Sequence, residues 1–386
     1  MPVINSIADN FEEMAKWRQH IHANPELGFE CHETAKFVVE RLKEFGVDEI
    51  SEGWAKTGVV AVINGKGEGG TIGLRADMDA LPMPEMTGLE YASTVEGKMH
   101  ACGHDGHTTM LLGAAKYLAE TRNFSGRVVL IFQPAEEGGG GARVMCDEGL
   151  IEKYGITQVF GQHNMPDLPV GEFQTRAGPL MASVDDFEIT IFGKGGHAAR
   201  PNSTVDPIVA GAAMVQSLQT IVSRNIDPIE CGVLTVTQFH GGTAFNIIPE
   251  TVKLTGTLRS FTAEVKALMR NRLVEIMDNT AAAYGARAEL TYRDGYPSTV
   301  NNAEKAEFAM KVAASIVGDD QVSLSAPPRM GAEDFSFMLE KCPGAYVFVG
   351  NGPSAALHHQ EFNFNDEAAP IGASYLARIV EAAQPV

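Results

Sequence analysis

The chain has 386 residues, 44% of them hydrophobic and 20% charged, a composition that excludes a small disulfide scaffold and a disordered tail. One hydrophobic core usually organises no more than ~250–300 residues, so we expect two domains. The 30 basic and 49 acidic residues give a formal charge of −19. Such a field repels phosphate groups, and we expect neither nucleic acid nor a membrane as a partner.

The five cysteines are odd in number and widely spaced, which does not indicate a disulfide framework. The N-terminal segment carries Asp9, Glu12 and Glu13 where a secretion signal needs an apolar core. No run of ~18 apolar residues occurs. These features predict a reducing, cytoplasmic location.

The first half of the chain alternates predicted helices and strands. Apolar spacing predicts helices over 9–23 and 32–45, and β-branched runs predict strands over 58–65 and 71–76. The order continues as helix 107–120, strand 127–132, helix 141–149 and strand 158–163. The strands are continuously apolar, which is typical of a mostly parallel sheet covered by helices on both faces.

After about residue 180 the strands alternate between apolar and polar residues, which is typical of a sheet with one wet face. We interpret 180–292 as an inserted α+β domain of β-α-β-β-α type. Segments 302–317, 345–350 and 367–383 return to the first domain, which therefore comprises 1–179 and 293–386. The predicted fold class is α/β with an inserted α+β domain.

The stretch MHACGHDGHTTML places Cys102 and His104 two residues apart on a loop that enters a helix. In an extended Cys-Gly-His both side chains turn to the same side and can bind one metal ion. The alternative is structural: His104 or Asp105 caps the helix and Cys102 is a small buried hydrophobe. Taken alone, this motif favours the structural alternative.

Two adjacent carboxylates, Glu136 and Glu137, follow the predicted strand 127–132 and precede a glycine stretch. They repel each other, and a cation would relieve that repulsion. Neighbours in an extended segment point apart, so one carboxylate can bind metal while the other faces a substrate. A solvated loop is the equally weighted alternative.

Further candidates lie at the ends of other predicted strands. His163 closes one strand, Asp77 and Asp79 follow another, and His358 and His359 come after a glycine-rich turn. Each is unremarkable alone, since turn aspartates usually bond their own backbone. At the same edge of one sheet they predict a metal site. Thiolate and imidazole ligands favour Zn, with Mn, Co or Ni as alternatives, and the number of ligands indicates two ions.

Other catalytic chemistries have weaker support. The chain has neither a G-x-S-x-G elbow nor an H-E-x-x-H helix. Cys102 could be the nucleophile of a cysteine amidase, but this leaves the glutamate pair, His163 and His358 without a role. A non-catalytic metal-dependent binding protein would need the metal ligands and not Glu136.

Motifs along the whole chain resemble the hippurate hydrolase and N-acyl-amino-acid amidohydrolase branch of the dinuclear metallo-aminoacylase/carboxypeptidase family, which also contains plant auxin-conjugate hydrolases. The matching stretches are WRQHIHANPELGFECHET, LRADMDALPMPE, MHACGHDGHTTMLLGAA, FQPAEEGGGGARVM, GQHNMP, GKGGHAARP, FNIIPETVKLTGTLRSF, GAEDFSFML and ALHHQEFNF. The resemblance implies a metallopeptidase-like catalytic domain and a lid or dimerisation domain over 180–292.

The resemblance also implies residue roles. The metal ligands fall on Cys102, His104, Glu137, His163 and His358. The general base falls on Glu136, with Asp79 supporting the metal centre. His197 matches an oxyanion-stabilising residue that often reaches the partner subunit's site, and Asn246 and Arg259 match groups that hold the substrate carboxylate. The wider family often has a ligand histidine at the position of Asp77, so Cys102 becomes the candidate bridge between two ions.

These assignments predict a metal-dependent amidohydrolase that cleaves a small N-acyl amino acid to a carboxylic acid and a free amino acid. A dipeptidase or carboxypeptidase with the same mechanism is the alternative. The resemblance further implies a homodimer, or a higher homo-oligomer, formed through the lid domain.

Overall fold

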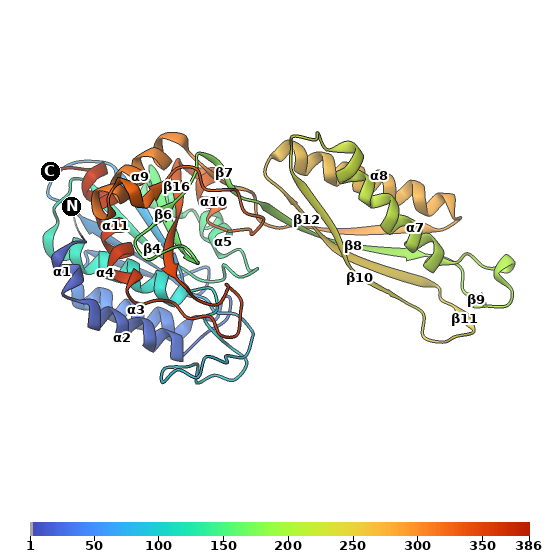
Figure 1. The fold of residues 1–386 in the computed structure, drawn as a ribbon, viewed down its shortest axis with the longest axis horizontal. Helices are drawn as coiled ribbons and strands as arrows, with labels where there is room; N and C mark the ends of the chain where they lie inside the picture. Colours follow the sequence, from blue (N-terminus) through green and yellow to red (C-terminus); the bar gives the residue numbers. More distant parts are fainter. Residues whose placement is uncertain (1–2) are drawn as a thin grey trace. The chain divides into compact units, whose positions relative to one another are not determined.

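The computed structural model describes residues 3–386 and divides into two compact units (Figure 1). The first unit runs to Leu180 and resumes over Thr299–Pro327 and Asp334–Val386. The second unit consists of Met181–Ser298 and Pro328–Glu333. It extends beyond residue 292 because Val184 N donates to Tyr296 O, so that the segment after the last strand stays attached to the sheet.

The first unit contains an eight-stranded sheet in the order β1-β2-β4-β3-β5-β16-β6-β15. The strands are β1 (Glu49–Trp54), β2 (Gly58–Asn64), β3 (Thr71–Asp77), β4 (Arg127–Gln133), β5 (Gln158–Pro166), β6 (Phe173–Gln174), β15 (Val322–Ser323) and β16 (Gly344–Gly352). The central strands β4, β3, β5 and β16 are parallel neighbours, whereas β1 and β2 are antiparallel. The mostly parallel sheet is therefore confirmed.

Helices cover this sheet, as predicted from apolar spacing. They are α1 (Asn5–Ala8), α2 (Phe11–Ala23), α3 (His32–Phe45), α4 (His104–Thr121), α5 (Gly141–Asp147), α6 (Leu150–Tyr154), α9 (Ala303–Val317), α10 (Ser336–Lys341) and α11 (Ala368–Ala383). The structure adds α1, α6, α10 and strand β1, which we did not predict. Within residues 3–386 no helix is both long and apolar enough to cross a bilayer.

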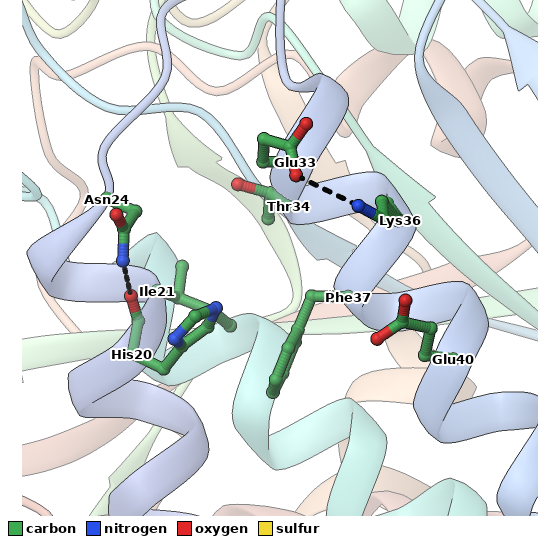
Figure 2. Close-up of a pocket in the computed structure, with 8 residues that line it drawn as sticks. All are labelled: His20, Ile21, Asn24, Glu33, Thr34, Lys36, Phe37 and Glu40. Atoms are coloured by element: carbon green, nitrogen blue, oxygen red, sulfur yellow. Dashed lines mark hydrogen bonds and ion pairs between the residues drawn. The ribbon is translucent and has the colours of Figure 1, made fainter.

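Helices α2 and α3 flank a surface hollow on the first unit (Figure 2). Its lining includes the exposed His20, whose ring stacks on Phe37 at a centroid distance of 4.8 Å. It contains none of the predicted metal ligands. The opposite side of α2 is buried, with Met14 and Trp17 in the core.

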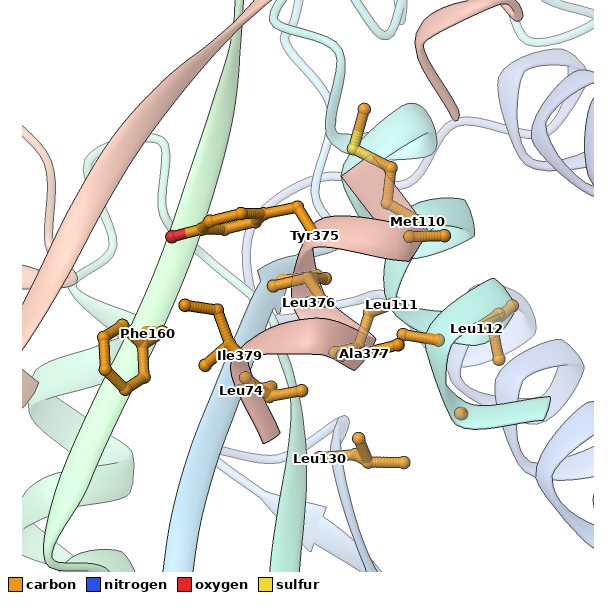
Figure 3. Packing of buried hydrophobic residues seen from close by; sticks show 14 of the residues in the cluster. Leu74, Met110, Leu111, Leu112, Leu130, Phe160, Tyr375, Leu376, Ala377 and Ile379 are labelled. Atoms are coloured by element: carbon orange, nitrogen blue, oxygen red, sulfur yellow. The ribbon is translucent and has the colours of Figure 1, made fainter. Parts of the chain in front are cut away.

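The core of the first unit explains why its strands carry no period-two pattern. Every residue of β3 is buried, and only the terminal residue of β2 and of β4 is exposed. Leu74 and Leu130 on neighbouring strands pack in one cluster with Leu376 and Ile379 of α11 (Figure 3). The buried charged side chains Arg75, Asp77 and His163 lie toward the carboxyl ends of the strands, where they need partners other than apolar side chains.

The second unit contains a four-stranded antiparallel sheet, β10-β12-β8-β13, packed against two helices. Its elements are β8 (Ser183–Phe192), β9 (Gly196–His197), α7 (Pro207–Thr220), β10 (Gly232–Gly241), β11 (Ile247–Ile248), β12 (Thr251–Ser260), α8 (Ala263–Ala283) and β13 (Arg287–Asp294). Alternating burial along β8 and β12 confirms the predicted period of two. The expected β-α-β-β-α order lacks β13, an eight-residue strand with intermediate and exposed residues that we did not recognise.

A two-stranded ribbon, β7 (Gly178–Met181) with β14 (Thr299–Asn301), lies where the chain passes between the units. The segment 328–333, which we expected in the first domain, belongs to the second unit. Its Arg329 O accepts from Ala182 N, and no element of its own marks it in the sequence.

Candidate metal centre

The candidate residues of the first unit converge at the carboxyl ends of neighbouring parallel strands. They come from five segments: Asp77 and Asp79 at the end of β3, Glu136 and Glu137 after β4, His163 on β5, Cys102 and His104 at the start of α4, and His358 after β16. Parallel strands bring their carboxyl ends to one edge, which is why distant residues meet there.

Cys102 belongs to two groups of potential metal ligands. Its Sγ lies 3.4 Å from His163 Nε2, and these two atoms and a nitrogen of His104 are all within 4.8 Å of one another. Cys102 also forms a group with Glu137 and His358, whose Oε1 and Nε2 atoms are 3.2 Å apart. One thiol shared by two sets of ligands is the arrangement that a bridging ligand between two ions requires.

The histidine rings are oriented so that one nitrogen remains available. His104 Nδ1 donates to the backbone oxygen of Asp79 at 2.8 Å, and His163 Nδ1 donates to Asn164 O at 2.6 Å. In each ring Nδ1 is thereby engaged and Nε2 is directed toward the other candidate ligands, which is how ligand histidines are oriented in metal sites. Among the described residues, His104 Nε2 has no hydrogen-bond partner although it is buried. The donor set and this unpartnered atom fit a divalent metal.

The charges of the cluster perturb one another strongly. Burial raises the pKa of the Cys102 thiol, and the charge of Glu137 raises it further. Burial opposes the charged form of His104, yet Asp77 raises its pKa well above the ordinary value. Hydrogen bonds with Cys102 and Glu137 raise the pKa of His358 to about 10. Closely packed thiol and carboxylate groups are stabilised by cations, which the protonated histidines supply in the metal-free chain.

Asp79 organises the segment that carries the two glutamates. Its Oδ1 accepts from Glu136 N at 2.9 Å and its Oδ2 from Glu137 N at 3.0 Å. Ala135 has φ 58°, so the segment is a tight turn and not the extended segment that we expected. Both glutamates and His104 consequently offer ligand atoms within 4.8 Å of one another. Asp79 supports the site through the backbone and through both of its carboxylate oxygens.

Both carboxylate oxygens of Asp77 already accept hydrogen bonds from neighbouring side chains, so Asp77 is less available as a metal ligand. Arg75 Nη1 donates to Asp77 Oδ2 at 2.8 Å, and His107 Nδ1 donates to Asp77 Oδ1 at 2.6 Å. Burial opposes its ionisation, but Arg75 and the histidines lower the pKa of Asp77 well below its usual range. Asp77, His104 and His107 form a further group with metal-ligand spacing. In this group, the charge of Asp77 is already matched by Arg75.

A buried polar layer lies behind these residues, and we did not predict it. Arg75 Nε donates to Gln133 Oε1 and its Nη2 to Asp334 Oδ1, both at 2.8 Å. Asp334 also accepts from Ala142 N at 2.9 Å, which ties it to the start of α5. An arginine in the middle of a short, mostly apolar predicted strand was the available signal, because a fully buried charge needs a partner.

The loop before α4 brings Cys102 and His104 together differently from the extended Cys-Gly-His that we expected. Gly103 has φ 90°, and a Cβ atom there would lie 2.2 Å from Asn164 Oδ1, so glycine is required on both counts. The structural alternative of a side-chain cap is not observed: Gly103 is the N-cap residue and no side chain caps the helix. Asp105 pairs with His22 instead.

The three candidates in the second unit do not meet within that unit. His197 and Asn246 share the exposed β9–β11 ribbon, where His197 pairs with Ile247 and Ala198 N donates to Asn246 O. This ribbon follows the end of the sheet at which Phe192 pairs with Thr251. Arg259 lies near the other end of β12, about 26 Å away at ~3.3 Å per residue of extended strand.

Arg259 is only partly buried, and its Nη1 donates to Met330 O at 3.3 Å. Burial lowers its pKa, and Asp186 opposes that shift. No carboxylate forms an ion pair with its guanidinium among residues 3–386. An acidic ligand group would satisfy its remaining donors.

A covered, mostly parallel sheet with Cys, His and Glu at its carboxyl edge is the architecture of a metal-dependent hydrolase. Comparison with known proteins agrees. The model of peptidase family M20/M25/M40 matches residues 73–382. The chain belongs to this family, and it is an amidohydrolase.

Three relatives resemble the chain over nearly its whole length. Hippurate hydrolase of Campylobacter jejuni is 43% identical, covering 98% of both chains. N-acetylcysteine deacetylase of Bacillus subtilis is 40% identical, covering 94% of both chains. Thermostable carboxypeptidase 1 of Saccharolobus solfataricus is 40% identical, covering 97% of both chains.

Two solved structures share the fold. A putative aminohydrolase from methicillin-resistant Staphylococcus aureus is 34% identical with a TM-score of 0.92, covering 99% of both chains. The Bacillus subtilis YXEP protein, described as a dinuclear metal binding peptidase of the M20 family, is 36% identical with a TM-score of 0.86. It covers 97% of this chain and 98% of its own.

Proposed function

We propose that this chain hydrolyses the amide bond of N-acyl amino acids to a carboxylic acid and a free amino acid. The observation that carries the proposal is the thiol of Cys102 shared by two groups of ligands beside an additional carboxylate, Glu136. Hippurate hydrolase and N-acetylcysteine deacetylase, both about 40% identical, are named for substrates of this class.

The proposed site binds two divalent metal ions. Cys102, His104 and His163 would hold one ion, and Cys102, Glu137 and His358 the other, with the thiolate as the bridge. Mixed sulfur, nitrogen and oxygen ligands favour Zn, and Mn, Co and Ni are the alternatives. The dinuclear description of the Bacillus subtilis protein supports this stoichiometry. All five cysteines are free, which supports a cytoplasmic location.

Divalent ions in such a site polarise a carbonyl group and lower the pKa of water. The proposed role of Glu136 is to accept a proton from the attacking water and to return it to the leaving amine. Glu136 is buried, at 7% exposure, and Asp79 fixes its backbone. A buried, positioned carboxylate needs little reorganisation to transfer a proton.

A Cys102 nucleophile is less well supported. Burial raises the pKa of its thiol, which disfavours the thiolate that nucleophilic attack requires. His163 Nε2 lies 3.4 Å from Sγ, but burial lowers the pKa of this histidine well below its usual range. It is therefore a poor acceptor for the thiol proton.

The residues of the second unit are proposed to bind the substrate. Arg259 and Asn246 would hold its carboxylate and His197 would stabilise the oxyanion. The ~26 Å of β12 between Arg259 and Thr251, the end of the strand that follows the ribbon, exceeds the length of an N-acyl amino acid. We therefore propose that His197 and Asn246 act on the substrate held by a second copy of the chain.

A homodimer through the second unit would supply that second copy. Strand β10 is an edge strand of the sheet: it pairs with β12 on one side and with no described strand of the sheet on the other. Phe239 on β10 and Val209 on α7 are exposed at 40% and 50%. An unpaired edge strand beside exposed apolar side chains is suited to pairing with another chain.

The central test is Glu136→Gln, which keeps the size of the side chain and removes its acid–base function. We expect full metal content, and turnover of hippurate and N-acetyl amino acids reduced on the order of 10²–10⁴-fold. Chelation of the wild-type protein should abolish activity, and added Zn, Mn, Co or Ni should restore it. Near-normal turnover by the variant would remove Glu136 from the mechanism. Preference for N-blocked dipeptides over all N-acyl amino acids would instead identify a carboxypeptidase.

The contribution of a second copy is tested by mixing subunits. His197→Ala and Glu136→Gln are each expected to be nearly inactive as single variants. A mixture reassembled from both should recover part of the activity, because one site then combines an intact Glu136 with an intact His197. Absence of recovery, with mixed assemblies demonstrated by differential tagging, would mean that His197 acts within its own chain.

A further inference from the structure

Helix α2 buries two cationic side chains that the proposed chemistry does not use. Arg18 and His22 are one helical turn apart, and both are completely buried, at 0% exposure. Buried charges are rare in proteins and require partners, because removal from water is costly. The contacts of these two residues therefore indicate what the helix does for the rest of the first unit.

His22 is bonded through both of its ring nitrogens. Nδ1 donates to Asp105 Oδ2 at 2.8 Å, and Nε2 donates to Glu85 Oε1 at 3.3 Å. A ring that donates to two carboxylates carries both protons and is an imidazolium. Burial lowers the pKa of His22, but the hydrogen bonds to Asp105 and Glu85 outweigh it and raise the pKa to about 9. The charge of His22 is thus built into the folded state.

Arg18 shares the partner Asp105 with His22 and adds a third carboxylate, Asp366. Its Nε and Nη2 donate to the two oxygens of Asp366 at 2.7 and 3.0 Å, and its Nη1 lies 3.6 Å from Asp105 Oδ2. The guanidinium also lies over the Tyr91 ring, 4.4 Å from its centroid. A bidentate pair fixes the direction of a guanidinium as well as its distance.

The three carboxylates belong to segments that carry proposed metal ligands or their supports. Asp105 directly follows His104 in the first turn of α4. Glu85 lies between Asp79 and Cys102, in the loop from β3 to α4. Asp366 follows the turn that carries His358 and precedes α11. One face of α2 is therefore connected by ion pairs to three separate segments of the site.

We propose that Arg18 and His22 are positioning residues that hold these segments in the arrangement required for metal binding. The inference depends on the metal site proposed above. A buried ion pair contributes little net stability, because desolvation offsets the attraction, but its geometry restricts the segments that it joins. Metal affinity depends on ligand positions to a fraction of an ångström. The loss of these contacts should therefore weaken metal binding as well as lower stability, since removing one partner leaves the other charge buried and unpaired.

Two substitutions of His22 separate its contacts. The side-chain nitrogen of Asn can occupy the position of Nδ1, so His22→Asn keeps the hydrogen bond to Asp105. The longer Gln can place its nitrogen near Nε2, so His22→Gln keeps the bond to Glu85 and loses the one beside His104. Both variants remove the positive charge, so the comparison isolates the contact with Asp105.

Zn²⁺ affinity, measured by competition with a chelator, is the main readout. We expect His22→Gln to bind Zn²⁺ at least about tenfold more weakly than the wild-type protein, the scale of supporting contacts in metal sites, and His22→Asn to lose clearly less. After substitution with Co²⁺, the thiolate charge-transfer band should be weakened or shifted in the Gln variant at equal occupancy. Excess metal should restore part of the activity.

Two controls on the same helix separate positioning from general destabilisation. His20 is exposed, stacks on Phe37 and takes no part in the ion pairs of Arg18 and His22 (Figure 2). His20→Gln should therefore bind Zn²⁺ normally. Ile21 is buried at 2%, and Ile21→Ala should lower the melting temperature without a change in Zn²⁺ affinity. A loss of affinity in Ile21→Ala equal to that in His22→Gln would overturn the positioning role.

The outcomes also distinguish this inference from the proposed function. If the wild-type protein binds no divalent metal, the proposed metal site fails. If the wild-type protein binds metal and folded His22→Gln binds it equally well, only the positioning role fails. Should His22→Gln not fold, Arg18→Lys provides the same test, since it keeps the charge and loses the bidentate contact with Asp366. Normal Zn²⁺ affinity in that variant would overturn the role.

Discussion

In the first unit, Cys102, His104 and His163 come from separate segments and are buried against one another, whereas in the second unit His197 and Asn246 share an exposed ribbon far along the sheet from Arg259. The first group finds its partners within its own unit. The side chains of the second group are exposed or partly exposed, so they can bind a ligand or another chain outside that unit. Metal binding is therefore expected to be a property of the first unit, and substrate binding a property of the assembly.

The largest effect that separates the two regions is expected from Cys102→Ala. This substitution removes the thiol that both groups of ligands share, so the bound metal should fall from two ions to none or to loosely held traces, and turnover should be lost. Elemental analysis after gel filtration measures the change. His197→Ala, in the second unit, should retain both ions. Full metal content in Cys102→Ala would show that Cys102 is not the ligand that the two ions share.

A smaller effect is expected from Arg259→Lys. Lysine keeps the positive charge and cannot form the bidentate contact, so we expect kcat/KM for N-acyl amino acids to fall by roughly 10–100-fold through KM. Metal content should not change. The matched control is a substrate whose carboxylate is converted to an amide, because its hydrolysis should be insensitive to the substitution. Equal losses on both substrates would exclude a role in carboxylate binding.

The third effect concerns the dependence of stability on pH and belongs to the first unit alone. The pKa of His22 is raised to about 9 in the folded chain from the ordinary 6.5. Because the folded form binds this proton more tightly, the stabilisation is fully present below pH ~6.5 and is lost as pH rises through about 9, by an upper limit of about 3 kcal/mol. Urea unfolding between pH 6 and 10 measures it.

The matched control for this titration is His22→Gln, whose free energy of unfolding should vary less over the same interval. His22 belongs to the first unit, so substitutions in the second unit should leave the slope intact. If wild type and His22→Gln lost stability in parallel between pH 6 and 10, the buried imidazolium would not be the cause.

The sequence alone determined the elements of both units, because apolar spacing reflects which side of a helix or strand is buried. The continuous apolar runs at β3 and β4 and the alternating pattern of β8 and β12 are local properties, and each led to the observed strand. The polar residues after β3, β4 and β5 could be assigned to one edge, since parallel strands share it. The strand β13 alternates as well and was nevertheless missed, since its inward residues are only partly buried, and the short elements have no pattern to recognise.

Tertiary structure alone decided which of these polar residues touch. Asp79 accepts two backbone hydrogen bonds from the Glu136–Glu137 turn, Asp77 is neutralised by Arg75, and Arg18 reaches Asp366 at the far end of the chain. The same holds for the separation of His197 from Arg259, which depends on the register between β8 and β12. Such contacts join residues that are distant in sequence, so their geometry follows from how the segments pack and not from local spacing.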